Sequence, residues 1–464
     1  MSNLDKSYDL AIVGAGPAGI FTALELIKQD SGLDILILEK GSDIDSRSCP
    51  AKQEGINCVG CDNCSIVCGW GGAGAFSDGK LTLSPEIGGN LGDYIGQDKL
   101  TELVDYVDQE YLKFGAPQKV YSASQEALED IHSQATKAEL EFIPSKIRHL
   151  GTGYSKEILT AMRDHLLENG VEIRIGAYVT EIMATDGQVE GVKLADGQKI
   201  AADNVVVAPG RENAEWLSQE AERMEIDTTI NPVDIGVRVE VPSAVLEDLT
   251  DKVYESKFIY YNPSFDDKIR TFCMCPNGEV VSENNNGLIT VNGHSHAEKK
   301  TDNTNFALLV SKTFTEPFKE PITYGKDIAK LANLLGGGIL VQRLGDFLNG
   351  RRSTEKRIQR GLVEPTFKDA TPGDLSLVLP YRHMTAIVEM LEALDEITPG
   401  IYSRHTLLYG VEVKFYSSRL QVQDNLETKI DNLYTAGDGA GITRGLIQAS
   451  ASGVVIARDI LAAD

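Results

Sequence analysis

The sequence has no long hydrophobic run and no excess of positive charge. No stretch reaches the roughly 18 uncharged apolar residues that a membrane-spanning helix needs, so no membrane span is expected. A net charge of -25 over 464 residues repels polyanions, so nucleic acid is not an expected partner. A strand-like run begins at Tyr8 and leaves no room for a signal peptide, so we expect a cytoplasmic protein.

Cysteine is also scarce, and its seven copies are unevenly placed. In a cytoplasmic protein, cysteines are more often thiols, metal ligands or catalytic groups than parts of a disulfide framework. Four of them, Cys58, Cys61, Cys64 and Cys68, have the spacing C-x2-C-x2-C-x3-C and stand directly before the glycine-rich run GWGGAG. This arrangement places four thiols beside a loop that allows close approach of the backbone to a bound group.

The N-terminal segment has the pattern strand, tight turn, helix, strand. The apolar run at 8–13 ends in GAGPAG, a helical pattern follows, and DILILEK forms a second apolar run. Gly14, Gly16 and Gly19 occupy the positions that a dinucleotide-binding turn requires for the turn itself, for approach of a pyrophosphate and for packing of helix against strand. Glu39 ends the second strand, where a carboxylate can accept hydrogen bonds from a ribose diol. The segment therefore predicts a dinucleotide site.

Two later segments complete a nucleotide-binding domain. Strands between residues 171 and 207 alternate with turns at Asp186-Gly187 and Asp196-Gly197, which predicts hairpins of a small antiparallel sheet. The chain closes with a strand, a glycine turn containing Asp438 and a long helix rich in small residues. The predicted fold class is α/β, with a Rossmann-type domain assembled from separated segments and an inserted mixed α+β substrate domain. The predicted nucleotide-binding segments are 1–48, 151–230 and 405–464, with a cysteine- and glycine-rich loop and helical insertion at 49–150 and the substrate domain at 231–404.

Together these segments resemble the glutathione-reductase-like class of FAD flavoproteins. VGAGPAG with Glu39, the strand end VVVAPG and the closing LYTAGDGAG match the three FAD segments of that class, although Pro209 stands where the class usually has threonine. The resemblance implies FAD as the cofactor, with the pyrophosphate on the first glycine turn, the ribose on Glu39, the adenine at the backbone of Val179, and the flavin side on the last segment. The implied cofactor-binding residues are Gly14, Gly16, Pro17, Ala18, Gly19, Glu39, Lys40, Gly72, Ala73, Gly74, Val179, Pro209, Gly210, Gly437, Asp438 and Gly445.

Nearly the whole chain is also similar to a narrower group of bacterial and plastid FAD-dependent dehydrogenases whose substrates are undefined. GGAGAFSDGKL, FCMCPNGEVV, VQRLGDFLNGRRST and YGVEVKFYSSR carry this resemblance. It implies an FAD-dependent oxidoreductase that transfers a hydride or electron pair between flavin and a small organic substrate. Two alternatives stay open: a flavin-based redox sensor or electron carrier without a dedicated small-molecule substrate, and an RNA-modifying flavoenzyme, against which the acidic charge argues.

The sequence contains a single dinucleotide fingerprint. Related enzymes hold NAD(P)H beside FAD with a second strand, G-x-G-x-x-G turn and helix, and no second set is found here. The GGG run at 336–338 follows a helical pattern rather than a strand, so it does not qualify. NAD(P)H is therefore expected only as a transient reductant, or electrons arrive from a ferredoxin-like carrier.

Four residues of the second domain are candidates for catalysis. Cys273 and Cys275 are two residues apart on a probable strand, so both face one side, where they form either a redox-active pair or two small buried side chains. Glu412 and Lys414 alternate within a strand that leads into the last FAD segment. They would lie beside the flavin, or they form an ordinary ion pair of a sheet.

The cysteine run leaves three interpretations open. C-x2-C-x2-C-x3-C is the spacing by which bacterial ferredoxins bind iron–sulfur clusters. Gly69 rather than proline follows Cys68, and Cys49 is available as a remote fourth ligand. A [4Fe-4S] cluster here would pass single electrons to the flavin. Zinc is the second interpretation, and thiols that only stiffen the glycine loop are the third.

Overall fold

The computed structural model describes residues 6–29, 32–54, 59, 61, 63–77, 79–285, 287–295, 300–315, 317, 318 and 320–463. The chain divides into two compact units. Unit 1 comprises Met1–Val120, Ile147–Asn231 and Ser417–Asp464, and unit 2 comprises Tyr121–Lys146 and Pro232–Tyr416. No helix within the described ranges has the length and apolarity of a membrane span.

The unit boundaries differ from the predicted segments at several places, and residues 49–120 and 147–150 of the predicted insertion fall in unit 1. The stretch 121–146 carries α5 (Gln125–Lys137) and β5 (Glu141–Ile143), and it falls in unit 2 because β5 pairs with β13 (Lys257–Tyr261). β20 (Leu407–Lys414) also falls in unit 2, since it pairs with β12 (Val233–Pro242) and β18 (Leu340–Arg343). The closing segment of unit 1 therefore begins at Ser417 rather than at residue 405.

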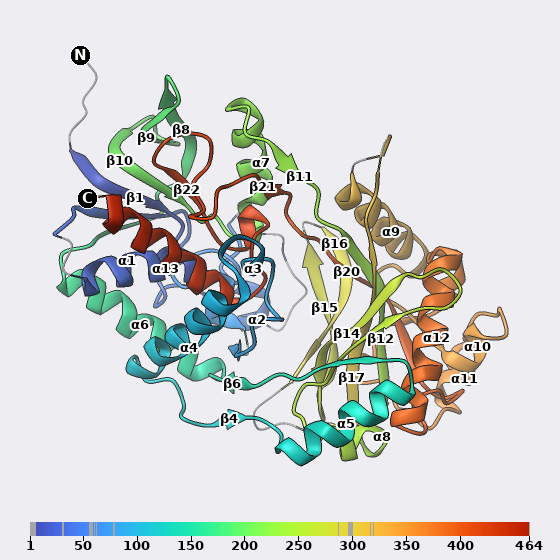
Figure 1. Cartoon of the computed structure of the whole chain (residues 1–464). Helices are drawn as coiled ribbons and strands as arrows, with labels where there is room; N and C mark the ends of the chain where they lie inside the picture. Colours follow the sequence, from blue (N-terminus) through green and yellow to red (C-terminus); the bar gives the residue numbers. More distant parts are fainter. Residues whose placement is uncertain are drawn as a thin grey trace. The chain divides into compact units, whose positions relative to one another are not determined.

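A seven-stranded sheet forms the centre of unit 1 (Figure 1). β1 (Ser7–Val13) lies between β2 (Ile35–Glu39) and β10 (Lys199–Val207) and is parallel to both. β7 (Glu172–Ile175) continues the parallel part beside β2, and β22 (Leu433–Thr435) pairs in parallel with β10. β2 is buried throughout, as expected for a parallel strand covered on both faces. The predicted Rossmann-type fold built from separated segments is confirmed.

Two helices far apart in the sequence lie side by side in unit 1. Figure 1 shows α1 (Pro17–Lys28), in blue, beside α13 (Leu446–Ala463), in red. A Cβ atom placed on Gly453 of α13 would lie 2.2 Å from the carbonyl oxygen of Ala18 and 2.9 Å from the amide nitrogen of Thr22. The small residues of the closing helix therefore serve close packing of the last segment against the first.

The predicted hairpins are also present. β8 (Val179–Thr185), β9 (Gln188–Leu194) and β10 pair in antiparallel fashion at one side of the sheet. Asp186 and Gly187 connect β8 to β9 with φ angles of 52° and 84°. Two consecutive positive φ angles are the requirement of a type I′ turn, which Asp-Gly satisfies readily.

Unit 2 is built on an eight-stranded sheet with the order β19-β18-β20-β12-β17-β14-β13-β5, in which β19 is Thr371–Pro372, β17 is Asn303–Lys312 and β14 is Lys268–Cys275. Along β12 the side chains alternate. Val237 and Val239 belong to an apolar core that also contains residues of α12 (Tyr381–Ile397), whereas Asp234, Arg238 and Glu240 are polar yet buried. Because successive residues of a strand face opposite sides, one face of this sheet carries buried charges.

A hairpin of β15 (Glu279–Asn285) and β16 (Leu288–His294) lies against this charged face. A Cβ atom on Gly293 of β16 would lie 2.2 Å from a guanidinium nitrogen of Arg238 and 2.3 Å from the side-chain oxygen of Asn305. Glycine is therefore required where the hairpin passes over Arg238, and this passage closes the charged face from solvent at that point.

Candidate functional site

The first glycine turn has the geometry that a dinucleotide-binding turn needs. A Cβ atom on Gly14, whose φ is +105°, would lie 2.2 Å from the carbonyl oxygen of Ala208, and one on Gly19 would lie 2.1 Å from the carbonyl oxygen of Gly14. A Cβ atom on Gly16 would meet nothing within 4 Å. The first and third glycines are thus required by packing, while the second faces open space at the N-terminus of α1, where backbone amides attract a phosphate.

All three predicted FAD segments and the glycine loop meet at this turn. A Cβ atom placed on Gly437 would lie 3.3 Å from the Cβ of Ala18. One on Gly439 would lie 2.5 Å from the carbonyl oxygen of Gly210, and one on Gly72 would lie 3.3 Å from the Cα of Gly16. Pro209, at the end of β10, lies beside Gly14. The glycine loop, which contains the 3-10 helix η1 (Gly72–Phe76), includes the exposed Ala73 and also Gly74, which packs against Leu446. The residues therefore form a cradle lined by backbone, which fits a pyrophosphate and the ribityl chain of FAD.

Glu39 has a more complex role than the predicted contact to a ribose. Its buried carboxylate accepts hydrogen bonds from the amides of Ala15 at 2.9 Å, Gly41 at 2.8 Å and Gly69 at 3.0 Å. An ionised carboxylate has about four acceptor positions, so one remains for a ribose hydroxyl. Glu39 therefore joins the first glycine turn to the cysteine and glycine loop as well as offering an acceptor to the cofactor.

Asp438 lies at the start of the 3-10 helix η4 (Asp438–Ala440), before α13. Its carboxylate accepts hydrogen bonds from the Thr443 hydroxyl at 2.8 Å and from the amide of Gly445 at 3.1 Å, and Arg211 approaches to 3.7 Å. Burial raises the pKa of Asp438, and these partners act against that shift. The carboxylate is thus fixed by its own segment, and about a fifth of the side chain remains exposed to receive a hydroxyl group.

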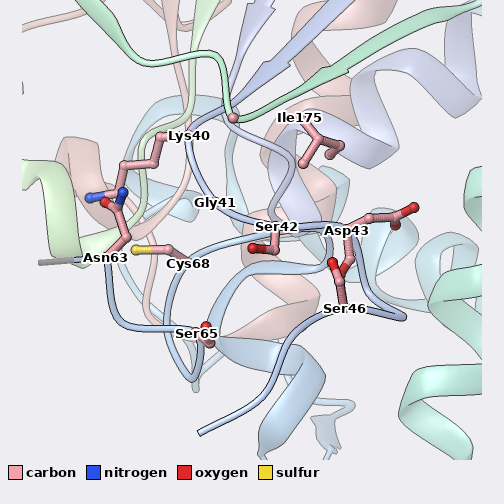
Figure 2. Close-up of a pocket in the computed structure, with 10 residues that line it drawn as sticks. Lys40, Gly41, Ser42, Asp43, Ser46, Asn63, Ser65, Cys68 and Ile175 are labelled. Atoms are coloured by element: carbon pink, nitrogen blue, oxygen red, sulfur yellow. The ribbon is translucent and has the colours of Figure 1, made fainter. Parts of the chain in front are cut away.

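A pocket of about 250 Å³ lies beside Lys40 and Gly41, directly after the end of β2. Lys40, Ser42, Cys68 and Ile175 are among its lining residues, and Figure 2 shows Lys40, Asn63 and Cys68 directed toward one another. The Lys40 ammonium donates a hydrogen bond to Asn213 at 2.7 Å. Just beyond this pocket, the amide of Ala177 donates to the carbonyl oxygen of Glu39 at 2.9 Å.

That hydrogen bond connects the segment before β8 to the end of β2. Val179, the first residue of β8, is buried and lies two residues beyond Ala177. The structure therefore brings the segment of Val179 to the carboxyl end of β2, where Glu39 and Lys40 stand, as a contact to adenine requires.

The sequence reasoning missed Arg47, which organises the cysteine and glycine loop. Its buried guanidinium donates four hydrogen bonds, all to backbone carbonyl oxygens, at distances between 2.6 and 3.0 Å; the acceptors are Ser65, Ile66, Trp70 and Gly72. Burial lowers the pKa of Arg47 to about 10, so it stays charged at neutral pH. A single arginine before a cysteine run gives no sequence signal of such a role.

The predicted metal centre receives no support from the described thiols. Cys58 lies outside the described residues, and Cys61 is exposed while Cys68 is buried. Among the residues that the structure describes, no group of three or more His, Cys, Asp or Glu side chains could hold a metal ion. Burial raises the pKa of the Cys68 thiol to about 11. The described part of the loop is instead held by Arg47.

In unit 2, Glu412 is engaged in a buried ion pair. Its carboxylate and the guanidinium of Arg238 form two hydrogen bonds of 2.8 and 2.9 Å, and both side chains have no exposed surface. Burial alone would raise the pKa of Glu412, but the charges of Arg238 and Lys414 outweigh it and lower the pKa. The structure therefore holds Glu412 in a buried ion pair with Arg238.

Lys414 lies at the edge of the same network. Its ammonium is 3.3 Å from Glu412 and 3.5 Å from Glu283. Burial alone would lower the pKa of Lys414, but the charges of these two carboxylates outweigh it and raise the pKa. Lys414 also stands 5.8 Å from the ring centre of Phe272, and Arg270 stands 4.8 Å from the same ring.

The alternating sequence DIGVRVEV of β12 could have predicted that charged side chains share one face of this strand. Charged residues that alternate with valine or isoleucine indicate a strand with one apolar and one polar face, and Asp234 and Arg238 are the polar members. Asp234 is buried and accepts hydrogen bonds from Arg270 at 2.6 Å and from the Tyr416 hydroxyl at 2.7 Å. The predicted candidates Glu412 and Lys414 are thus two members of a larger network.

Two sequence families match separate parts of the chain. Residues 232–415 match the family described as "FAD-dependent protein, C-terminal domain-like", and residues 134–243 match "Pyridine nucleotide-disulphide oxidoreductase". An uncharacterized protein of Clostridium beijerinckii (strain ATCC 51743 / NCIMB 8052) is 29% identical over 481 residues, which cover 97% of this chain and 80% of that protein.

Several solved structures are similar at low sequence identity. Formate oxidase has a TM-score of 0.46 at 14% identity, with 99% of this chain and 98% of that chain covered. The 3-ketosteroid-delta4-(5alpha)-dehydrogenase of Rhodococcus jostii RHA1 has a TM-score of 0.44 at 13% identity, with 98% and 97% covered. L-proline dehydrogenase of P. horikoshii has a TM-score of 0.40 at 11% identity, with 99% and 94% covered.

The glycine cradle of unit 1 and the two family matches define the class of the protein, which is a flavoprotein oxidoreductase. More specifically, the chain is an FAD-dependent oxidoreductase, as the resemblance of its motifs implied. FAD is confirmed as the cofactor.

Proposed function

We propose that this FAD-dependent oxidoreductase transfers a hydride or an electron pair between FAD and a small organic substrate, and that residues of unit 2 bind that substrate. When bound, FAD supplies the redox chemistry through its isoalloxazine ring. The chain's own residues then have to bind and orient the substrate, exclude water and supply a proton.

The observation that carries this proposal is the set of charges around Phe272. The cationic groups of Arg270 and Lys414 lie 4.8 and 5.8 Å from the centre of this half-buried ring. Buried ion pairs are often no more stabilising than apolar replacements, so a charged strip on one sheet face is better explained by ligand binding than by stability. The raised pKa of Lys414 keeps its ammonium charged, which suits it to orient a substrate oxygen through a charge-assisted hydrogen bond.

A variant pair tests the role of Lys414. Flavin absorbance near 450 nm is followed in a stopped-flow instrument. The reduced holoenzyme is mixed with α-keto acids, enones and quinones, and the oxidised enzyme is mixed with hydroxy acids and amino acids. We expect at least one compound to react well above the background rate, and Lys414→Met to slow it about 10- to 100-fold without loss of FAD. Lys330→Met, at an exposed position of α9 (Pro321–Gly336), is the matched control.

Slow reaction with every compound would count against this proposal and favour a redox sensor or electron carrier. For the reductant we propose NAD(P)H bound transiently or a ferredoxin-like protein, because the sequence has one dinucleotide fingerprint. A tight, stoichiometric NAD(P)H complex in calorimetry would contradict transient binding.

The iron–sulfur relay is not part of this proposal, because Arg47 provides the contacts that hold the described part of the cysteine loop. It stays a prediction of the spacing alone. Iron and acid-labile sulfide in anaerobically purified protein, lost in Cys61→Ala while FAD is retained, would establish it.

A further inference from the structure

Cys273 and Cys275 form a close pair of thiols at the end of β14. Their sulfur atoms are 3.9 Å apart, and the Cys275 thiol donates a long hydrogen bond of 3.5 Å to the carbonyl oxygen of Cys273. The two residues differ in accessibility, since Cys275 is 1% exposed whereas Cys273 is only half-buried. Cys273 is therefore the more exposed residue of the pair.

The backbone between the thiols departs from an extended strand. The pairing of β14 with β17 shifts register between Phe272 and Cys275, and Cys273 has a φ of +44°. Two residues of regular strand span about 7 Å, which is at the upper limit of the Cα separation that a disulfide tolerates. A left-handed residue is uncommon outside glycine and is typically held in place at functional sites, and here it turns the chain away from that extended geometry.

Two cationic side chains, Arg238 and Lys414, interact electrostatically with Cys273. The Arg238 guanidinium donates a hydrogen bond of 3.0 Å to the carbonyl oxygen of Cys273, and its position is fixed by Glu412. The negative charge of a Cys273 thiolate is among the influences that raise the pKa of both Arg238 and Lys414. Nearby cations favour the thiolate, which is the nucleophilic form of cysteine.

We propose that Cys273 and Cys275 form a reversible dithiol–disulfide site that exchanges with low-molecular-weight disulfides of the glutathione class. In the first step the Cys273 thiolate attacks one sulfur of the disulfide RSSR, an S–S bond to Cys273 forms, and RS⁻ leaves. In the second step the Cys275 thiolate attacks the Cys273 sulfur, the intramolecular S–S bond forms, and a second RS⁻ leaves. The two protons of the original thiols end on the leaving groups, so the protein loses two electrons and RSSR becomes two RSH.

This exchange differs in its chemistry from the function proposed above, although Lys414 belongs to the surroundings of both sites. The residues that match the pyridine nucleotide-disulphide oxidoreductase family, 134–243, contain no cysteine, so that match assigns no role to the pair. The exchange also requires neither flavin turnover nor an organic substrate. Failure of one proposal therefore leaves the other intact.

Mass spectrometry tests the site in the holoenzyme. The protein is equilibrated with glutathione buffers of defined ratio, quenched with acid, alkylated and digested with trypsin. Cleavage after Arg270 and Lys299 releases a peptide that contains Cys273 and Cys275 and no other cysteine. As the buffer becomes more oxidising, we expect the doubly alkylated peptide to be replaced by an unalkylated disulfide form, which is two hydrogens lighter than the unalkylated dithiol peptide. Reduction should restore the doubly alkylated form. Cys61, which is exposed, reports ordinary thiol reactivity in the same sample.

Single variants separate the two steps. Cys275→Ser should accumulate a glutathione adduct on Cys273, whereas Cys273→Ser should form adducts at least about tenfold more slowly, because Cys275 is buried and loses its activated partner. The proposal is overturned if the wild-type peptide stays doubly alkylated at every ratio while the same protein forms the disulfide after unfolding. It is equally overturned if Cys275→Ser folds and gains no adduct. The wild-type measurement decides the question even where a variant fails to fold.

Discussion

The buried pair of Arg238 and Glu412 gives the most direct test of how unit 2 is built. Glu412→Gln removes the negative charge that faces both Arg238 and Lys414, whereas Arg238→Met leaves Glu412 with Lys414 at 3.3 Å. Breaking a fully buried pair costs about 3 to 5 kcal/mol. We therefore expect Glu412→Gln to be the more destabilising of the two, and the double variant Arg238→Met/Glu412→Gln to be less destabilised than the sum of the single variants, with a coupling free energy of about 2 to 3 kcal/mol.

Urea unfolding of the FAD-loaded protein measures this effect unit by unit. Both tryptophans, Trp70 and Trp216, lie in unit 1, so tryptophan fluorescence reports that unit alone, while far-ultraviolet circular dichroism reports both units. With an m-value of about 2 to 3 kcal/mol per molar urea, a loss of about 4 kcal/mol lowers the midpoint of unit 2 by about 1.5 M. Glu412→Gln should therefore show a dichroism transition that precedes the fluorescence transition.

The exposed pair of Lys252 and Asp130, also in unit 2, supplies the control. Lys252→Met should leave both transitions unchanged, because exposed ion pairs contribute little. Additive effects of the two substitutions at 238 and 412 would refute a structural pair. A stable Glu412→Gln that abolishes flavin turnover would instead favour the catalytic position beside the flavin that the sequence left open for Glu412.

Three further outcomes are expected. Gly16→Val should weaken FAD retention at least about tenfold without a matching loss of secondary structure, because the side chain enters the open space where a pyrophosphate approaches; ultrafiltration of the holoenzyme measures this, and unchanged retention would move the phosphate site elsewhere. Arg47→Met should leave four carbonyl oxygens of the glycine loop without their donor, lower the melting temperature and release FAD, and Arg47→Lys should rescue little because an ammonium lacks the planar fork. Burial lowers the pKa of His383 to about 4 from about 6.5 in the unfolded chain. The folded protein therefore keeps its full stability above pH 6.5, where His383 is neutral in both states, and loses stability as pH falls toward 4. The unfolding free energy should drop by about 2 kcal/mol between pH 7 and pH 5 from this residue, and His383→Leu should flatten that dependence in urea titrations.

Much of the FAD site could be predicted from local sequence because its chemistry is mostly backbone. Gly14, Gly16 and Gly19 carry their roles in their spacing, since only glycine permits the turn and the close contacts that the structure shows. Asp186-Gly187 likewise determined a hairpin by its own conformational preference. The order of the remaining segments then followed from alternating strands and helices.

Side-chain roles in networks could not be predicted in the same way. Arg47 donates to carbonyl oxygens from 18 to 25 residues away along the chain, and no local pattern records such contacts. The register of β14 against β17 fixes how Cys273 and Cys275 approach each other, which spacing alone left open between a redox pair and two buried side chains.

The sequence by itself determined the α/β class and the first glycine turn of a dinucleotide site, because these depend on backbone conformation and on the periodicity of buried strands; FAD in particular followed from the resemblance of the motifs. Only the tertiary structure decided that Glu412 is held by Arg238 across β12 and β20, that Glu39 joins three loop segments and that Arg47 holds the described part of the cysteine loop. The physical reason is the same in each case: the free energy of a buried charge depends on which partners the fold brings within hydrogen-bonding distance, and most of those partners are distant in sequence.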